Sequence, residues 1–206
     1  MLPVYLSGLL LGLALIAPIG PQNVFIVGQG LAVGMPRALW AVLAAGFCDS
    51  LLIVAGAAGV SGIISAVPVV RLVLLAGGAV FLGYLGVQGL RSRGSRLEGL
   101  DAKPVAPRQV IAGTVTVSLL NPHAILDTVG VIGAAVAAQP ADSRMLFAGG
   151  TLSASWLWFL FLAAAAAMLR RRLTPRATVW FDRASGLVML FFAVLFSVEF
   201  ARAVTG

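Results

Sequence analysis

Two aspartates lie deep inside long apolar runs of this 206-residue chain. Asp49 stands in "AAGFCDSLLIVAG", and Asp127 stands in "SLLNPHAILDTVGVIG". A carboxylate in lipid costs about 2.5 to 3.5 kcal/mol even on the lenient insertion scale, so the side chain of Asp49 is expected to face the protein interior. Both acids could bind a cation or a proton. The alternative is a packing role, in which Asp127 would bond to His123, four residues earlier on the same helical face.

Prolines and amide side chains interrupt the apolar runs. The helix-breaking residues are Pro18, Gly20, Pro21 and Pro122. Proline lacks an N–H and leaves backbone carbonyls without partners. In hydrocarbon, such irregular backbone is tolerated only where it faces protein or a water-filled cavity, so the breaks predict an internal polar cavity. The neighbouring amides are expected to cap the broken helices, to bind a substrate, or both. They are Gln22, Asn23 and Asn121.

A cavity of this kind would have one end for an anion and another for a cation. The N-terminus of a half-helix presents free N–H groups and a positive dipole end, which suit a carboxylate. Freed carbonyls and the two aspartates suit an ammonium or a guanidinium, so the charge balance indicates a zwitterion with an extra positive charge, such as lysine or arginine. No cofactor and no metal site are predicted. The predicted substrate-binding residues are Gln22, Asn23, Asp49, Asn121, His123 and Asp127.

Asp49 and Asp127 are also the predicted proton-coupling groups. Moving a monovalent cation out of a negative interior costs about 2.3 kcal/mol per 100 mV, and exchange for one incoming proton cancels that electrical term. A carboxylate that holds either the proton or the substrate cation would enforce antiport. His123 is expected to orient Asp127 or to line the site. In "GTLSASWLWFLF", Ser153 and Trp156 could face the substrate, the indole through a cation–π contact, with packing as the alternative.

The surrounding sequence consists of apolar runs that can hold these residues in a bilayer. The chain is 60% hydrophobic and 10% charged, with a mean hydropathy of +1.04, which indicates a membrane protein. One crossing needs about 20 residues. Six transmembrane helices are therefore predicted, at 4–28, 38–64, 69–90, 109–138, 145–169 and 178–203.

Basic residues collect in the loops on one side of this arrangement. The loops after the first, third and fifth crossings hold Arg37, the cluster at 91–108 and the cluster at 170–176. The positive-inside rule places these loops in the cytoplasm and both termini outside. A five-crossing alternative, with a re-entrant first segment, puts the N-terminus inside. Because the net charge of +7 is dispersed in loops, nucleic-acid binding is not expected.

The chain divides into two similar halves, a three-helix repeat at 1–90 and another at 109–206, joined by the basic cytoplasmic loop at 91–108. When Pro21 is aligned with Pro122, a polar side chain follows each, and Gly28 and Gly130 close the next two turns. Three crossings are an odd number, so the halves are predicted to be inverted, as in many secondary transporters. The expected fold is an all-α membrane protein of six transmembrane helices in two inverted repeats, with helices 1 and 4 broken at their proline motifs.

Four stretches together resemble the lysine exporter (LysE/ArgO) family: "PIGPQNVFIVGQG", "CDSLLIVAG", "LNPHAILDTVGVIG" and "GTLSASWLWF". They follow the family order over nearly the whole chain. The resemblance implies a multi-pass bacterial inner-membrane exporter of L-lysine, L-arginine or close analogues, driven by ion gradients and without a prosthetic group. It also implies functional positions at Asn23, Asp49, Asn121 and Asp127.

Alternatives remain for the substrate and for the class of protein. Gly28 and the short, proline-containing central loop depart from the family pattern, and related branches export neutral amino acids such as threonine or homoserine. The acids stand in "FCD" and "ILD" rather than the contexts of an intramembrane aspartyl protease, and no serine in a Gly-x-Ser-x-Gly setting accompanies His123, so no enzyme is predicted. A channel or scaffold is a lesser alternative. Glycine-rich faces are compatible with a homodimer, although no spacing singles it out.

Overall fold

The computed structural model describes residues 1–58, 68–91, 106–170 and 172–205, and all regular structure within them is helical. Part of the second predicted crossing, 59–64, and most of the predicted loop at 91–108 lie outside these residues. The elements are α1 (Leu2–Ile16), α2 (Pro21–Val33), α3 (Leu39–Ala57), α5 (Pro68–Leu90), α7 (Pro107–Leu119), α8 (Pro122–Ile125), the π-helix η1 (Leu126–Ile132), α9 (Gly133–Ala137), α10 (Ala141–Arg170) and α11 (Pro175–Thr205).

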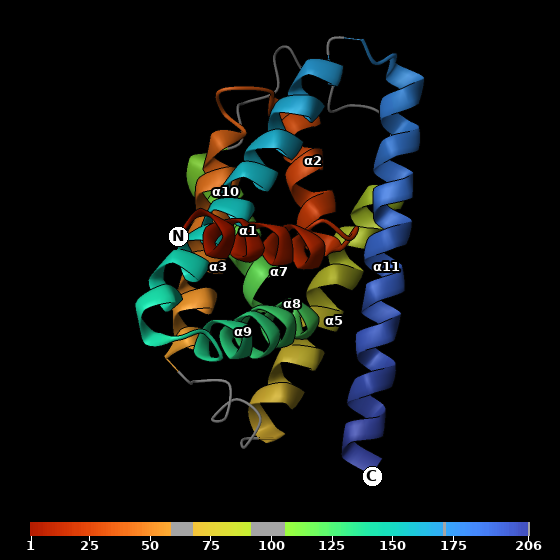
Figure 1. Cartoon of the computed structure of the whole chain (residues 1–206). Helices are drawn as coiled ribbons and strands as arrows, with labels where there is room; N and C mark the ends of the chain where they lie inside the picture. The colour runs from red at the N-terminus through yellow and green to blue at the C-terminus, as the bar shows by residue number, and fades with distance from the viewer. Residues whose placement is uncertain (59–67, 92–105, 171, 206) are drawn as a thin grey trace.

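Both predicted helix breaks are present. α1 ends at Ile16, and α2 starts at Pro21 after an extended Gly20 with φ of −126°. Proline suits the first position of a helix because the N–H it lacks would have no partner there. α1 and α2 meet at 84°, so α1 lies across the bundle while α2 runs along it (Figure 1). In the second half, α7 ends at Leu119 and α8 starts at Pro122.

Within the residues that the structure describes, four helices are long and apolar enough to cross a membrane, whereas the sequence predicts six crossings. They are α3, most of α5, α10 and α11, and the bent pair of α1 and α2 adds a fifth if it counts as one span. The predicted crossing at 109–138 is divided into α7, of 13 residues, and the apolar stretch Leu126–Ala137. Neither piece reaches the length of about 20 residues that a crossing needs. The described part of the chain is thus an all-helical fold with four or five candidate spans.

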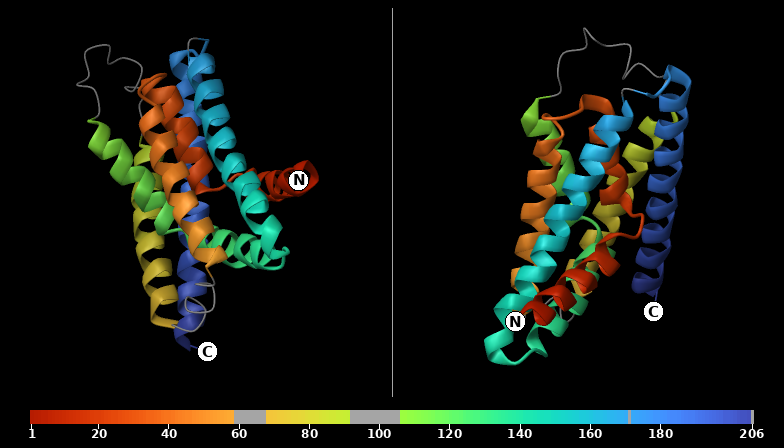
Figure 2. Two further views of the ribbon diagram at one scale, coloured as in Figure 1. Left: turned by 60° about the vertical axis from the view of Figure 1, so that its left-hand side comes forward. Right: turned by 45° about the horizontal axis from the view of Figure 1, so that its top comes forward.

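Helices of the two halves pack on each other reciprocally. α5 and α11 lie side by side over much of their length (Figure 2). α1 and α2 pack on α10, whereas α7, η1 and α9 pack on α3. The correspondence between the halves is incomplete. In the first half the helix that lies across the bundle is α1, which precedes the break, whereas in the second half α8 and α9 lie across the bundle and follow the break (Figure 1).

Glycines allow the close approach of several helix pairs. A Cβ on Gly8 would overlap the Phe147 carbonyl, and one on Gly150 would overlap the Tyr5 carbonyl, so α1 and α10 are nearly in backbone contact. In the same way, a Cβ on Gly56 of α3 would come within 2.6 Å of the Val129 carbonyl oxygen of η1. Such small-residue contacts replace the hydrophobic driving force that helices lack within lipid.

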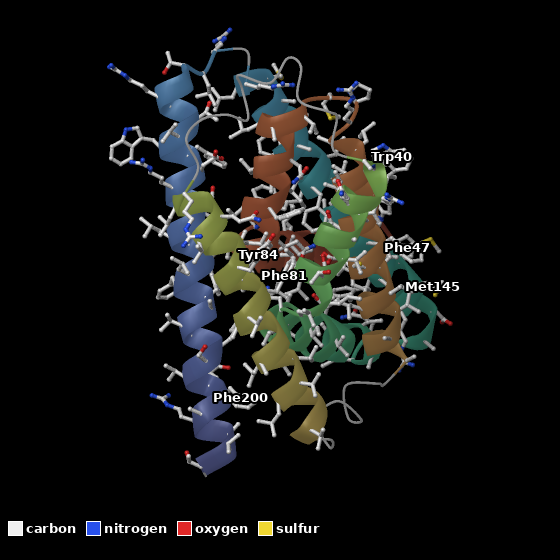
Figure 3. All side chains as sticks on the ribbon, turned by 180° about the vertical axis from the view of Figure 1, so that it is seen from behind. Trp40, Phe47, Phe81, Tyr84, Met145 and Phe200 are labelled. Atoms are coloured by element: carbon white, nitrogen blue, oxygen red, sulfur yellow. The ribbon has the colours of Figure 1, made fainter. Side chains whose placement is uncertain are left out.

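The outer surface of the bundle is apolar. Large side chains such as Phe47, Tyr84 and Met145 point outward and are exposed (Figure 3). The buried residues are instead small, aliphatic or polar over much of α3 and α10, including Thr151 and Ser155, which are fully buried. An apolar exterior, with polar side chains among the buried residues, fits a lipid-facing bundle.

Candidate substrate cavity

The two helix breaks meet at one cavity of about 180 Å³. In Figure 1 the breaks between α1 and α2 and between α7 and α8 lie near the middle of the bundle. Five of the six predicted substrate-binding residues line it: Gln22, Asn23, Asp49, Asn121 and Asp127. The helix-breaking residues Pro18, Gly20 and Pro21 line it as well, with Phe159 and Phe192 among the apolar walls. The sequence motifs from four separate segments therefore share one site.

Asp49 is the most enclosed acid of the cavity, with 4% of its surface exposed. Gln22 Nε2 donates to Asp49 Oδ1 at 3.2 Å, and Ser155 Oγ donates to Asp49 Oδ2 at 3.1 Å. The carboxyl group is thus held by side chains from two other helices, α2 and α10. Both donors are neutral, and no described arginine or lysine pairs with it. A cation entering the cavity would find an acid whose charge is not already balanced.

Asn23 closes the first break. Its Nδ2 donates to the carbonyl oxygens of Ile16 and Pro18, each at 2.8 Å. These are carbonyls that the interrupted helix cannot satisfy, and an unpaired buried carbonyl costs about 1 to 3 kcal/mol. Asn23 is therefore a capping residue in this structure. Its carbonyl Oδ1 is the atom left for a ligand.

The second break is held more weakly. Asn121 Oδ1 accepts from the Ala124 N–H at a long 3.4 Å, as an N-cap of α8 would. Pro122 is buried at the start of that helix. The following turns widen into η1, which carries Asp127 and the buried Thr128. A π-helix is uncommon and occurs often at functional sites.

Asp127 has a different environment from Asp49, because it lines the cavity yet is exposed. The cavity therefore holds one enclosed, hydrogen-bonded acid and one open acid. The predicted pairing of Asp127 with His123 falls on a side chain outside the described residues, since only the backbone of His123 is described, in α8.

Ser153 and Trp156 do not line the cavity. Ser153 Oγ accepts from the Tyr5 hydroxyl at 2.8 Å and donates to the Gly149 carbonyl, so it joins α1 to α10. The Trp156 indole donates to Ser50 Oγ at 3.2 Å, and its ring covers Gly46. In this structure both side chains contact neighbouring helices, and their predicted contact with a substrate stays a prediction.

Ser155 is the residue that sequence reasoning missed. It is fully buried and donates to Asp49, although it stands between Ser153 and Trp156 in the same motif. A signal was present, because Thr151, Ser155 and Phe159 are spaced by four and so occupy one helix face. Of these, Phe159 lines the cavity.

Broken helices that meet at a buried polar cavity within an apolar bundle define a membrane transporter. The family description "LysE type translocator" matches residues 13–199, and the chain belongs to this family. It is accordingly a transporter and not an enzyme.

Individual relatives are similar over nearly their full lengths. The chain is 40% identical to "Putative amino-acid transporter YisU" of Bacillus subtilis (strain 168), over 94% of this chain and 89% of the relative. It is 38% identical to "Arginine exporter protein ArgO" of Enterobacter sp. (strain 638), over 100% and 99%. The protein of that name from Escherichia coli (strain K12) is 36% identical, over 92% and 91%. No solved structure matches the chain.

Proposed function

We propose that this protein exports basic L-amino acids, arginine and/or lysine, from the bacterial cytoplasm in exchange for protons. The observation that carries the proposal is Asp49, an enclosed carboxyl group at the meeting point of the two helix breaks, with which no basic side chain of the described residues pairs. Relatives named as arginine exporters across the full chain support the substrate class.

In the proposed binding mode, the ends of the amino acid lie at opposite parts of the cavity. The ammonium or guanidinium of the side chain contacts Asp49 and Asp127. The α-carboxylate lies at the N-terminus of α2, where Pro21 has no N–H and the first intrahelical bond is donated by Val24. The free N–H groups are those of Gln22 and Asn23, and the helix dipole adds a favourable field for an anion.

Proton coupling follows from competition for Asp49. A substrate cation at this carboxylate takes the place of the Gln22 amide donor, which frees the first turn of α2 from α3. When the substrate leaves, an incoming proton neutralises Asp49, and the carboxylic acid can donate to Gln22 Oε1 after the amide rotates. One charge moves each way, so the electrical cost of about 2.3 kcal/mol per 100 mV cancels. Asp127, which is open to the cavity, would receive the cation first.

Orientation and symmetry belong to the same proposal. Arg37, Arg91 and Arg172 lie in or next to the loops at one end of the bundle, and the C-terminus lies at the other (Figure 1). The positive-inside rule then places the basic loops in the cytoplasm and the termini outside the inner membrane. Reciprocal packing of 1–90 against 109–206 supports an inverted repeat of six crossings. The 84° bend between α1 and α2 is compatible with the alternative of five crossings and a re-entrant first segment.

Export of neutral amino acids of the threonine or homoserine type is the second candidate. The observation that favours it is that Asp49 is enclosed whereas Asp127 is exposed. One enclosed carboxyl group would match the single ammonium group of a neutral amino acid. A channel or a non-transporting scaffold is the lesser alternative for the function. A homodimer is a separate prediction.

Counterflow with competing substrates separates these candidates. Proteoliposomes loaded with unlabelled arginine should accumulate radiolabelled arginine, and external lysine should compete while threonine and homoserine should not. Competition by threonine and homoserine alone would move the assignment to the neutral branch. Flux that grows linearly with concentration and shows no counterflow would indicate a channel.

A further inference from the structure

The proposed binding mode leaves one charged group of the substrate without a contact. Arginine and lysine carry an α-ammonium beside the α-carboxylate, in addition to the cation at the end of the side chain. The side-chain cation is assigned to Asp49 and Asp127, and the α-carboxylate to the first turn of α2. An ammonium has N–H donors only, and burying it without acceptors is costly. A cavity wall should therefore supply acceptors that no other group uses.

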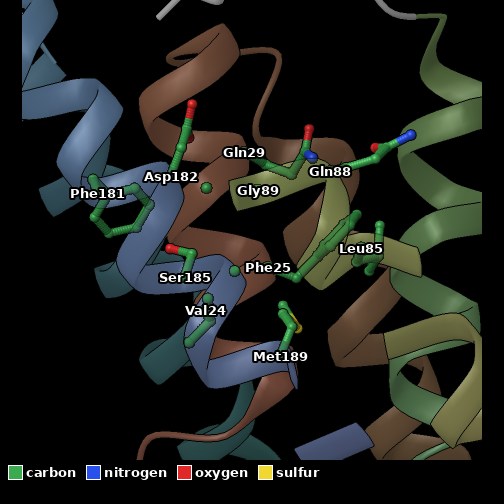
Figure 4. Close-up of a pocket in the computed structure, with 12 residues that line it drawn as sticks. Val24, Phe25, Gln29, Leu85, Gln88, Gly89, Phe181, Asp182, Ser185 and Met189 are labelled. Atoms are coloured by element: carbon green, nitrogen blue, oxygen red, sulfur yellow. The ribbon is translucent and has the colours of Figure 1, made fainter. Parts of the chain in front are cut away.

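A second cavity, of about 70 Å³, lies between α2, α5 and α11 (Figure 4). The polar ends of Gln29, Gln88 and Asp182, which line it, do not converge on one point. Phe25 and Met189 give it an apolar wall. An ammonium there would meet scattered polar groups, so the search for its acceptors returns to the central cavity, the one of about 180 Å³ at the helix breaks.

Thr128 is a buried side chain of the central cavity, with 6% of its surface exposed. Within the part of the chain that the structure describes, its hydroxyl has no hydrogen-bond partner. Each of the other three buried threonines found there donates to a backbone carbonyl three or four residues earlier. They are Thr114, which donates to Val110, Thr151, which donates to Ala148, and Thr178, which donates to Thr174. Thr128 is thus the exception among them.

The π-helix accounts for this exception. In an α-helix a threonine hydroxyl commonly bonds the carbonyl of the preceding turn. Thr128 lies in η1, where backbone hydrogen bonds join residues five apart and the turns are wider. The usual acceptor is therefore displaced from the hydroxyl, which is left to the cavity.

Thr128 also lies on the wall that the first turn of α2 faces. In Figure 1, α8 and α9, which flank η1, lie on the opposite side of the break between α1 and α2 from the body of α2. Adjacent residues of a helix do not share a face, and Thr128 is buried where Asp127 is exposed. Because the α-ammonium and the α-carboxylate share one carbon, a carboxylate at the start of α2 brings the ammonium toward this wall.

We propose that Thr128 Oγ1 accepts a hydrogen bond from the α-ammonium of the substrate, with Asn23 Oδ1 as a second acceptor. The inference rests on the proposed function and adds a specificity-determining residue to it. Asn23 can take this part because its Nδ2 caps the helix break and its Oδ1 does not. The contact makes the site select α-amino acids over acids that lack the α-ammonium.

Competition against counterflow of radiolabelled arginine in proteoliposomes tests the contact. The two inhibitors are unlabelled arginine and 5-guanidinopentanoate, which keeps the guanidinium and the carboxylate but lacks the α-ammonium. Thr128→Val should raise the Ki of arginine about tenfold, because one charge-assisted hydrogen bond is lost. The Ki of 5-guanidinopentanoate should not change. Thr128→Ser, which keeps the hydroxyl, should retain both values of the wild type.

Thr114→Val is the matched control, because it removes a buried threonine hydroxyl outside the cavity lining and should leave both Ki values unchanged. Equal increases of the two Ki values in Thr128→Val, or no increase in either, would overturn the contact and leave the proposed function standing. If Thr128→Val does not transport, the same two compounds are compared by the rise in melting temperature that they cause in detergent. A wild type that transports neither arginine nor lysine would overturn the proposed function and the contact with it.

Discussion

At the scale of single residues, the account depends on how Asp49 is held. Ser155 donates to its carboxylate, whereas Ser153, two residues earlier on the same helix, bonds to Tyr5 and Gly149 away from the cavity. A hydrogen bond to a charged group contributes about 1.5 to 3 kcal/mol, so Ser155→Ala should lower kcat/KM for arginine about tenfold or more. Ser153→Ala should keep the kcat/KM of the wild type. Equal losses in the two variants would show that the contact with Asp49 has no special role in transport.

Asn23 caps the break between α1 and α2 by donating to two backbone carbonyls. Asn23→Ala leaves the carbonyls of Ile16 and Pro18 without their donor, at a cost of about 1 to 3 kcal/mol for each buried group. We expect a melting temperature in detergent well below that of the wild type. Asn121→Ala removes one long hydrogen bond and should lower it less. The reverse order of stability would contradict the capping role of Asn23.

At the scale of helices, the packing of α1 on α10 depends on glycine. A Cβ at Gly150 would overlap the Tyr5 carbonyl, whereas a Cβ at Gly149 would meet nothing within 4 Å. Overpacking of this kind costs about 1 to 3 kcal/mol, so Gly150→Ala should lower the melting temperature. Gly149→Ala should leave it unchanged or raise it, because alanine is favoured over glycine in a helix by about 1 kcal/mol. Equal melting temperatures of the two variants would mean that α1 does not approach α10 so closely.

The helix breaks and the central cavity were predictable because they follow from the chemistry of proline and of buried charge. Pro21 and Pro122 start new helices, and Asp49 faces the interior, as expected. Sequence alone could not predict η1, because its widened turns depend on packing against α3. Sequence alone left open whether the first segment spans the membrane or is re-entrant, since a run of apolar residues has the same composition whether it runs along the bundle or lies across it.

At the scale of the whole molecule, orientation in the membrane follows from the distribution of arginine. In a Cys48→Ala background, Arg172→Cys and Arg202→Cys introduce a thiol near opposite ends of the bundle. The positive-inside rule predicts that a membrane-impermeant maleimide labels Arg202→Cys in intact cells and labels Arg172→Cys only after permeabilisation. The opposite labelling would invert the proposed orientation.

The central claim is that one carboxyl group, Asp49, exchanges a substrate cation for a proton. The measurement that tests it most directly is efflux of radiolabelled arginine and lysine from proteoliposomes with and without an imposed pH gradient, for the wild type, Asp49→Asn and the exposed control Asp142→Asn. We expect an inward proton gradient to accelerate efflux in the wild type and in Asp142→Asn, and to have no effect in Asp49→Asn. Efflux through Asp49→Asn that responds to the pH gradient as the wild type does would contradict the account.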